Sequence, residues 1–449
     1  MGTKRTYKRI NVKQIDLEQL RDRAIQHGNS GTSVGLDIGK GEVVVCVRWP
    51  NGEFERPWSV ANTSQIGMLL ERLELLKEVC GSLTVGMEST GTYGEAVRRA
   101  MTESGIVVHR VSGKATSDYQ EIFDGVPSQH DGKDAAIVSE LTAFGKGTAW
   151  PYVCDSESLQ LVKHQFRRMD CYRTEQVRWL GRLEALLAKH WPELTKHLKL
   201  SSATLLKMLK KYQSPGSLVA DPKAAKQLQA WGGSRLTEQK ITLVLESART
   251  TCGVPATLSE SLWLGEVASK ALEAYREVQS CQRNLKQLMA QDKTMVGYVS
   301  AVGAATLGAL WSTVGDPRQY GSSGAYLKAL GLNLKERSSG RRQGQLAITK
   351  RGPSKARRWV FYWSLRAIQR EELSDWYRQF IRVGNATSGK REHRKMKGVV
   401  AMMRKLCRGL WYAMKHEEEF DYNKLLELKK PRAKRSRRRG KASASKLEI

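Results

Sequence analysis

The spacing of apolar residues divides the chain into a mixed first part and a long helical second part. From Ser33 to about residue 150, short apolar runs alternate with amphipathic segments. Apolar or alternating runs predict five strands, at 33–39, 42–49, 53–60, 82–88 and 106–111. Apolar residues three and four positions apart predict helices at 64–78, 91–105 and 133–146. Three successive strands followed by alternating helices and strands predict an α/β fold with a mixed sheet.

Between about residues 155 and 292 the strand signals vanish. One apolar stripe runs from Leu159 to Leu187 and a second from Ala268 to Leu288, both in helical steps. Two such helices predict either a coiled-coil hairpin or a dimer seam, and an ordinary helical bundle within one protomer fits the same spacing. Residues 200–260 between them predict a smaller helical insert, interrupted by Pro and Gly.

Five segments follow from these patterns. The predicted boundaries are a polar N-terminal extension (1–32), an α/β domain (33–150), a helical region (151–292), a mostly helical C-terminal domain (293–428) and a basic tail (429–449). The tail has nine Lys or Arg among residues 429–441 and no acid, which predicts a disordered segment that binds a polyanion.

The net charge of the chain indicates which class of molecule it binds. The chain has 75 Lys and Arg against 45 Asp and Glu, a formal net charge of +30. Nucleic acid is the partner that best offsets such a charge, because neutralised phosphates release counterions. No apolar run approaches the roughly 20 residues of a spanning helix, and the N-terminus lacks a signal-peptide core. The seven Cys form no CxxC pair, which favours reduced thiols in a cytosol over disulfides or zinc.

Four acids stand out as candidate chemistry. Asp37 lies inside an apolar strand, Glu88 ends another strand, and Asp131 and Asp134 begin a helix on one face. A carboxylate in an apolar strand is unfavourable unless it is paired or bound to metal. Together the four predict an all-oxygen site for Mg²⁺ or Mn²⁺, of the kind that cleaves phosphodiesters. Taken singly, each acid could equally cap a turn or form a salt bridge.

A Gly- and Ser-rich loop at 331–359 lies in a dense basic patch. The basic residues are Lys335, Arg337, Arg341, Arg342, Lys350, Arg351, Lys355, Arg357 and Arg358. Arginines bind phosphate oxygens in bidentate fashion, and a serine among them could attack phosphorus. Phosphate binding without chemistry explains the same residues. Residues 302–305 (VGAA) predict either a phosphate contact at a helix N-terminus or a small-residue packing seam.

These motifs resemble one known family. GLDIGK, MESTGTYG and HDGKDA are similar, in that order, to the DEDD-type transposases of the insertion sequence one-ten family. The segment from AVGAATLGAL through RSSG to ITKRGPSKARRW resembles the C-terminal domain of the same family. The chain departs from it at Asn333-Leu334, where a proline step is usual, and at Arg341, where Gly is common.

The resemblance implies a fold and a mechanism. It implies a RuvC-like, ribonuclease-H-like N-terminal domain in which Asp37, Glu88, Asp131 and Asp134 are the four family acids. It also implies that Ser339 becomes attached transiently to DNA, with Ser338 as the second choice. On this resemblance the protein is a transposase of an insertion sequence, guided to DNA by a structured bridge RNA. Family members act as oligomers, so we expect a homo-oligomer (a dimer or a tetramer) in the bacterial cytoplasm at the nucleoid.

Two other functions remain open from the residues. A RuvC-like, structure-specific endonuclease would need the four acids but not Ser339. A nucleic-acid-binding scaffold would need neither, although the presence of all four acids argues against it.

Overall fold

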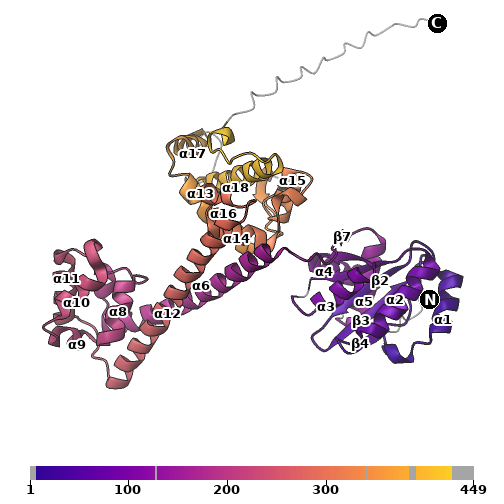
Figure 1. Cartoon of the computed structure of the whole chain (residues 1–449), viewed down its shortest axis with the longest axis horizontal. Helices are drawn as coiled ribbons and strands as arrows, with labels where there is room; N and C mark the ends of the chain where they lie inside the picture. Colours follow the sequence, from indigo (N-terminus) through magenta and orange to yellow (C-terminus); the bar gives the residue numbers. More distant parts are fainter. Residues whose placement is uncertain (1–6, 90, 127–128, 340–341, 384–390, 427–449) are drawn as a thin grey trace, which may run out of the picture. The chain divides into compact units, whose positions relative to one another are not determined.

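The computed structural model describes residues 7–89, 91–126, 129–339, 342–383 and 391–426. The chain separates into two compact units, residues 1–154 and 155–449 (Figure 1). The predicted basic tail, 429–449, lies outside the described residues. Within them we find no helix with the length and apolar character that a membrane crossing requires.

The first unit is built on a mixed sheet. Its strands, seven among the described residues, are β1 (Ile10–Asn11), β2 (Ser33–Ile38), β3 (Glu42–Arg48), β4 (Trp58–Ala61), β5 (Thr84–Glu88), β6 (Val107–Val111) and β7 (Thr148–Ala149). Their order is β1-β4-β3-β2-β5-β6-β7. Strands β2, β3 and β4 form the antiparallel meander, while β5 and β6 run parallel to β2. The α/β prediction is confirmed, as is the mostly helical character of the second unit.

Helices cover both faces of this sheet. They are α1 (Leu17–His27), α2 (Ile66–Cys80), α3 (Glu95–Glu103), α4 (Gly113–Asp124) and α5 (Asp131–Ala143), with a 3₁₀ turn η1 (Val12–Gln14). Alternate residues of β3 belong to two cores: Val43 and Val45 pack with the α2 side, and Val44 and Cys46 pack with α5. Strands buried on both faces carry continuous apolar runs, which explains the sequence EVVVCV.

The N-terminal extension is part of this fold. Strand β1 adds to the sheet edge by pairing in parallel with β4, and α1 packs against α2. Leu20 and Ala24 of α1 are buried. The polar sequence of residues 1–30 predicts a short helix and a linker, but the few apolar positions of α1 (Leu17, Leu20, Ala24 and Ile25) form too short a stripe to predict its packing on the sheet. Helix α4 is an element that the apolar pattern did not predict.

Two long helices organise the second unit. Helices α6 (Glu157–His190) and α12 (Leu258–Gln291) pack along each other (Figure 1). The insert between them forms α7 (Leu194–His197), α8 (Ala203–Tyr212), α9 (Pro215–Ala220), α10 (Ala224–Gly232), η2 (Gly233–Arg235) and α11 (Glu238–Arg249). Most apolar residues of the predicted stripes are therefore buried within one chain, although Val177 of α6 is 64% exposed. Leu187 joins the core of the insert, and Phe166 joins the core of the C-terminal helices.

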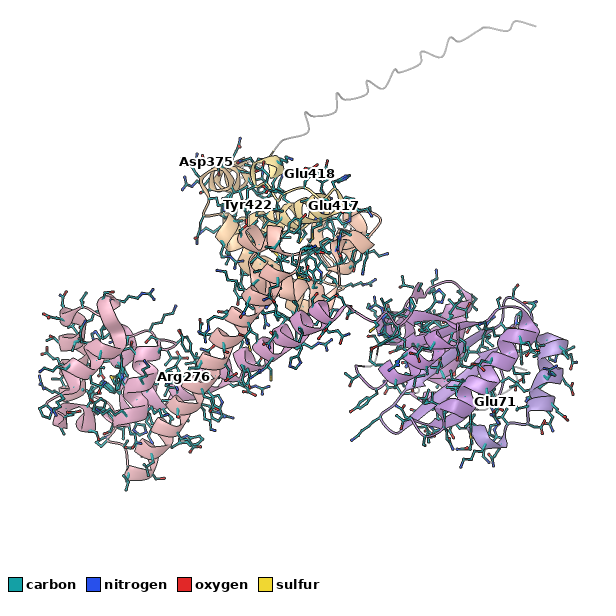
Figure 2. The ribbon with its side chains drawn as sticks, in the orientation of Figure 1. Glu71, Arg276, Asp375, Glu417, Glu418 and Tyr422 are labelled. Carbon is teal, nitrogen blue, oxygen red and sulfur yellow. The ribbon has the colours of Figure 1, made fainter. Side chains whose placement is uncertain are left out.

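The C-terminal part is helical except for one hairpin. Its elements are α13 (Val296–Val302), α14 (Ala304–Thr313), η3 (Pro317–Gln319), α15 (Ser323–Ala329), β8 (Leu334–Ser339), β9 (Arg342–Ile348), α16 (Ser354–Ala367), α17 (Glu371–Val383), α18 (Arg391–Lys415) and η5 (Asn423–Leu425). The chain after α18 is tied to the preceding helices. The Tyr298 hydroxyl donates to the Glu418 carbonyl at 2.9 Å, and the Trp363 indole donates to the Tyr422 hydroxyl at 3.0 Å. Figure 2 labels Glu418 and Tyr422.

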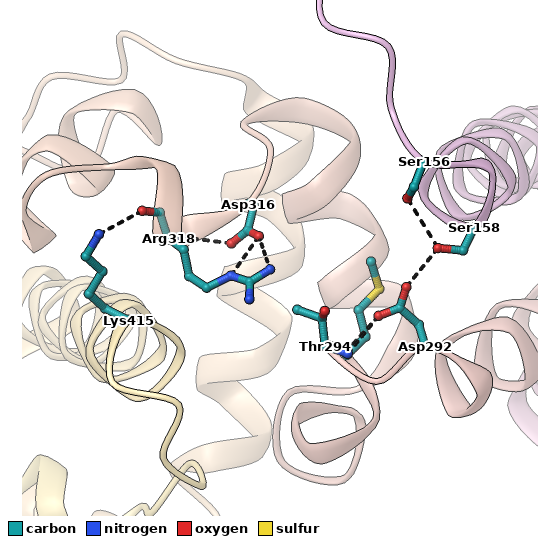
Figure 3. A network of polar contacts seen from close by, with 8 residues as sticks. Ser156, Ser158, Asp292, Thr294, Asp316, Arg318 and Lys415 are labelled. Atoms are coloured by element: carbon teal, nitrogen blue, oxygen red, sulfur yellow. Dashed lines mark hydrogen bonds and ion pairs between the residues drawn. The ribbon is translucent and has the colours of Figure 1, made fainter.

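Polar side-chain contacts hold several helix ends of the second unit in place. The Ser158 hydroxyl, at the start of α6, donates to the Asp292 carboxylate that follows α12, at 2.8 Å (Figure 3). Farther along, Arg318 pairs with Asp316 at 2.6 Å, and the Lys415 ammonium donates to the Arg318 carbonyl at 3.2 Å. These contacts hold the first turn of α6 and the last turn of α18 against the loops beside them.

Candidate active site

Two glycines allow helix α5 to pack directly against the sheet, and this close contact, which we call the slot, positions the site. Gly35 of β2 and Gly86 of β5 are register partners on adjacent parallel strands. A β-carbon at Gly35 would overlap the Ala135 carbonyl and the Ser139 amide of α5, and one at Gly86 would overlap the Thr142 hydroxyl. Helix α5 therefore lies directly on the backbone of both strands. No side chain could be added at either glycine without moving it.

The slot places two of the predicted acids. Side chains alternate along a strand, so residues two apart share a face. Asp37 follows Gly35 by two residues, and Glu88 follows Gly86 by two. Both acids thus lie on the α5 face of the sheet, at the carboxyl ends of neighbouring parallel strands.

Helix α5 brings the other two acids. Asp131 and Asp134 occupy its first turn, and the N-cap residue His130 accepts a hydrogen bond from the Gly132 amide at 3.1 Å. Carboxylates are favoured at a helix N-terminus because backbone N–H groups and the helix dipole carry positive charge there. The structure thus gathers all four acids at one edge of the sheet.

The pKa of the Asp37 carboxyl reflects the closeness of the other three acids. Burial is the largest cause that raises the pKa of the Asp37 carboxyl, from 3.8 to about 6. The negative charges of three neighbouring carboxylates raise it further, in the order Asp134, Asp131 and Glu88. Excess negative charge of this kind is what a divalent cation relieves.

Three of the acids have hydrogen-bond partners from the protein. Glu88 accepts from the Thr116 hydroxyl of α4. Asp134 accepts from the Gln120 amide at 3.0 Å, also from α4. Asp131 pairs with the Arg9 guanidinium at 3.0 Å. These partners could not be predicted from the sequence, because all three lie on segments that carry no motif.

The donor chemistry fits a hard divalent cation, since all four groups are carboxylates. Within the described residues, however, no group of three or more acidic, His or Cys side chains is arranged to hold a metal ion. The four acids are neighbours but not yet a closed ligand set, and their hydrogen bonds to α4 and Arg9 hold them in this arrangement.

The predicted serine lies on a hairpin instead of a loop. Strands β8 and β9 pair antiparallel, and Ser339 is the last residue of β8, opposite Arg342. A register irregularity falls between Arg337 and Ser339. The structure describes only the backbone of Arg337, Ser338, Ser339 and Arg342. Arg341 lies outside the described residues. The first three residues of the RSSG motif therefore lie at the end of β8.

Two family models match the chain. Residues 34–192 match a DEDD-type IS110 model described as Transposase, and residues 296–379 match a model described as Transposase IS116/IS110/IS902 family. The first covers the four acids and the second covers the serine hairpin. The chain belongs to the IS110 family of DEDD transposases. No curated protein matches the transposase.

Three of the basic residues that follow the transposase's hairpin have partners inside the protein. The Arg357 guanidinium donates to the Gly352 carbonyl at 2.6 Å and to the Leu330 carbonyl at 3.3 Å. Burial lowers the pKa of this guanidinium. Arg357 thus holds the start of α16 against the end of α15.

Lys355 and Arg358 both pair with Asp170, an acid of α6 that is only 4% exposed. The Lys355 ammonium lies 2.8 Å from the carboxylate. Lys335, Lys350 and Arg351 are exposed. Lys355 and Arg358 are also partly exposed, at 57% and 41%, but the carboxylate of Asp170 occupies them. Among the described side chains of the basic patch, Lys335, Lys350 and Arg351 are thus exposed to solvent without such an ion pair.

The four carboxylates Asp37, Glu88, Asp131 and Asp134 form what we call the acid site. The sequence analysis did not predict one further residue beside it. Lys133 lies between Asp131 and Asp134 and is completely buried. Its ammonium donates to the Asp124 carboxylate at 2.7 Å and to the Val126 carbonyl. The signal for it was slight: a lysine between the two aspartates, just before the apolar run that begins at Ala135. It ties the end of α4 to the turn that carries both aspartates.

The segment around Val302 takes the form of two short helices joined at Gly303. The Arg366 guanidinium of α16 donates to the Val302 carbonyl at 3.0 Å, and Thr306 and Leu307 are buried. Packing therefore accounts for part of this segment in the transposase, and its contact with phosphate stays a prediction.

Proposed function

We propose that this transposase cuts and rejoins DNA through a phosphoserine intermediate, assisted by the four carboxylates. The observation that carries the proposal is the convergence of Asp37, Glu88, Asp131 and Asp134 at one sheet edge in a chain that also bears the serine hairpin. Membership of a transposase family supports DNA as the substrate.

In the first step the Ser339 hydroxyl oxygen attacks a DNA phosphorus. A serine–phosphorus bond forms, one phosphodiester bond breaks, and the leaving DNA oxygen takes up a proton. In the second step a hydroxyl of another DNA end attacks the phosphoserine and releases the serine. One bond is exchanged for another at each step, so no nucleotide hydrolysis is required.

The four acids would hold Mg²⁺ or Mn²⁺, which would supply Lewis-acid stabilisation of the phosphoryl oxygens. The chain's own part is to gather the carboxylates and to offer cations to the phosphate backbone. Those cations are Arg337, Arg341, Arg342, Lys350, Arg351, Lys355, Arg357 and Arg358, and the first three border Ser339 in sequence.

We further propose that a structured guide RNA selects the DNA sites and that the protein acts as a homo-oligomer (a dimer or a tetramer) at the bacterial nucleoid. The large positive charge supports a polyanionic partner beyond the DNA itself.

The test is a covalent DNA–protein adduct. Purified protein is incubated with Mg²⁺, RNA from cells carrying the element, and labelled DNA of the element ends. We expect an adduct that survives denaturation in the wild type and in Ser338→Ala but not in Ser339→Ala. An adduct that persists in Ser339→Ala and disappears in Ser338→Ala would move the nucleophile to Ser338.

The alternative is a RuvC-like, metal-dependent endonuclease. Nicked DNA that appears without any adduct, in wild type and Ser339→Ala alike, would favour that function. The four acids would then act alone, and the serine would be a phosphate ligand.

A further inference from the structure

The N-terminal segment, residues 7–11, is held beside the acid site at several points. Ile10 and Asn11 pair with Trp58 and Ser59 of β4. The Tyr7 hydroxyl donates to the second carboxylate oxygen of Asp124 at 2.8 Å. The stretch between these anchors is only two residues long, so the position of the Arg9 backbone follows from the fold.

A backbone contact from the sheet edge adds to these anchors. The Arg56 guanidinium donates to the Lys8 carbonyl at 2.8 Å. A β-carbon at Gly132 would approach the Tyr7 carbonyl to 2.9 Å, so the segment also lies against the first turn of α5. The segment thus runs beside the turn that carries Asp131.

Arg9 bridges two carboxylates from this position. One guanidinium nitrogen, Nη1, lies 2.5 Å from Glu42 and 3.0 Å from Asp131. Glu42 begins β3, directly after the turn that follows Asp37. The side chains of Arg9 and Asp131 are 34% and 60% exposed, so the contact can open without unfolding the core.

The nature of the Asp131 partner differs from that of the others. Glu88 and Asp134 accept hydrogen bonds from a neutral hydroxyl and a neutral amide. Such donors can stay in place when a carboxylate binds a metal ion. A guanidinium 3.0 Å from Asp131 would instead lie beside a divalent cation of the same sign and repel it.

We propose that Arg9 is an internal latch on the acid site: it occupies Asp131 with a protein cation and must leave before a divalent cation can be held there. This inference rests on the proposed metal site. An exposed ion pair contributes only about 0.2–1 kcal/mol, so the latch is weak enough to be displaced.

The experiment is a titration of the full-length protein with Mn²⁺, following free Mn²⁺ by electron paramagnetic resonance. Four proteins are compared: wild type, Arg9→Gln, Lys8→Gln and Asp37→Asn. Lys8→Gln is the matched control. Lys8 precedes Arg9, its side chain is exposed, and the substitution removes the same single positive charge. Asp37→Asn identifies the binding that belongs to the acid site.

We expect Arg9→Gln to lower the Kd of the Asp37-dependent site by about three- to tenfold, since it removes both the competing ion pair and a like charge. Lys8→Gln should stay within about twofold of wild type. Equal affinities for Arg9→Gln and Lys8→Gln, or weaker binding in Arg9→Gln, would overturn the latch while leaving the metal site intact. If no protein showed Asp37-dependent binding, the metal part of the proposed function would fall, and the latch with it.

Discussion

At the scale of single residues, the carboxyl group of Asp37 is held where its charge is unfavourable. Burial and three nearby carboxylates raise its pKa from 3.8 to about 6. A carboxyl whose pKa is higher in the folded protein binds more protons there than in the unfolded chain. Its stabilising effect is therefore complete below about pH 4 and is lost as pH rises through 6.

We expect Asp37→Asn to stabilise the metal-free protein at pH 8. The gain, about 1–2 kcal/mol after allowance for the partial exposure of the group, should fade between pH 6 and pH 4. Thermal unfolding in EDTA at pH 4.5 and pH 8 measures it. The control is Asp22→Asn, an exposed acid of α1, which should change Tm little at either pH. A Tm for Asp37→Asn below that of wild type at pH 8 would contradict the assigned electrostatics.

Lys133 is a second residue whose effect follows from its surroundings. It is fully buried and faces Asp124, whose side chain is 20% exposed. Removing one partner of a buried pair leaves the other charge uncompensated. Lys133→Met should therefore destabilise the protein by about 3 kcal/mol in urea unfolding followed by tryptophan fluorescence.

The matched control for that substitution is Lys114→Met, which breaks the exposed pair with Asp118 on α4. It should cost less than about 0.5 kcal/mol. Adding Asp124→Asn to Lys133→Met should recover part of the lost stability. Equal losses for the two lysine variants would show that the buried pair is not what holds α4 to α5.

At the scale of elements, the contact of α5 with β2 and β5 decides whether the acids meet. Gly35→Ala would place a methyl group on the backbone of α5 at Ala135 and Ser139. We expect a loss of about 3 kcal/mol or more, because backbone cannot yield as a flexible side chain can. Divalent-cation-dependent DNA cleavage should fall with it.

Gly67→Ala on α2 is the control, since open space surrounds that glycine. There, alanine should stabilise the helix by about 0.5–1 kcal/mol. Gly35→Ala with wild-type stability and cleavage would mean that α5 does not lie on the strand as described.

A second element contact joins α6 to α16 through Asp170. Asp170→Asn should remove about 1–2 kcal/mol of stability, as the carboxylate is buried but its two cations are partly exposed. Glu277→Gln, which breaks an exposed pair with Arg168, should cost under about 0.5 kcal/mol. Urea unfolding compares the two variants. Similar small losses would show that the α6–α16 contact does not depend on the ion pairs.

At the scale of the whole molecule, the two units differ in charge. Residues 1–154 hold 18 Lys and Arg against 19 Asp and Glu, which leaves 57 of the 75 basic and 26 of the 45 acidic residues in 155–449. The entire positive excess thus belongs to the second unit. Binding to the phosphate backbone of nucleic acid should therefore depend on residues 155–449. The acid site lies in the other unit, which is nearly neutral.

The salt dependence of DNA binding tests this division. Arg351→Gln, in the exposed stretch after β9, should weaken binding and lower the slope of log K against log salt by about 1. Arg21→Gln removes an exposed charge from the first unit and should leave the slope unchanged. Fluorescence anisotropy with a labelled duplex gives both values, and equal slopes for the two variants would count against the division.

The sequence by itself determined the features that depend on local order. Period-two and helical spacing predicted the strands and long helices, because burial on one face imposes that spacing directly. Asp37 and Glu88 were also visible in it, since a charged residue within or at the end of an apolar strand breaks the local pattern. Asp131 and Asp134 were visible from their three-residue spacing at a helix start. The short strands β1 and β7 and the helix α4 were missed, as their apolar stripes are too brief.

Only the tertiary structure decided which groups meet. The slot at Gly35 and Gly86, the buried pair of Lys133 with Asp124, and the Arg9 bridge all join residues far apart in the chain or hidden within a motif. Periodicity carries no information about such contacts. For the same reason the basic patch could not be divided in advance: Arg357 and Arg358 bind groups inside the protein, whereas Arg351 faces solvent.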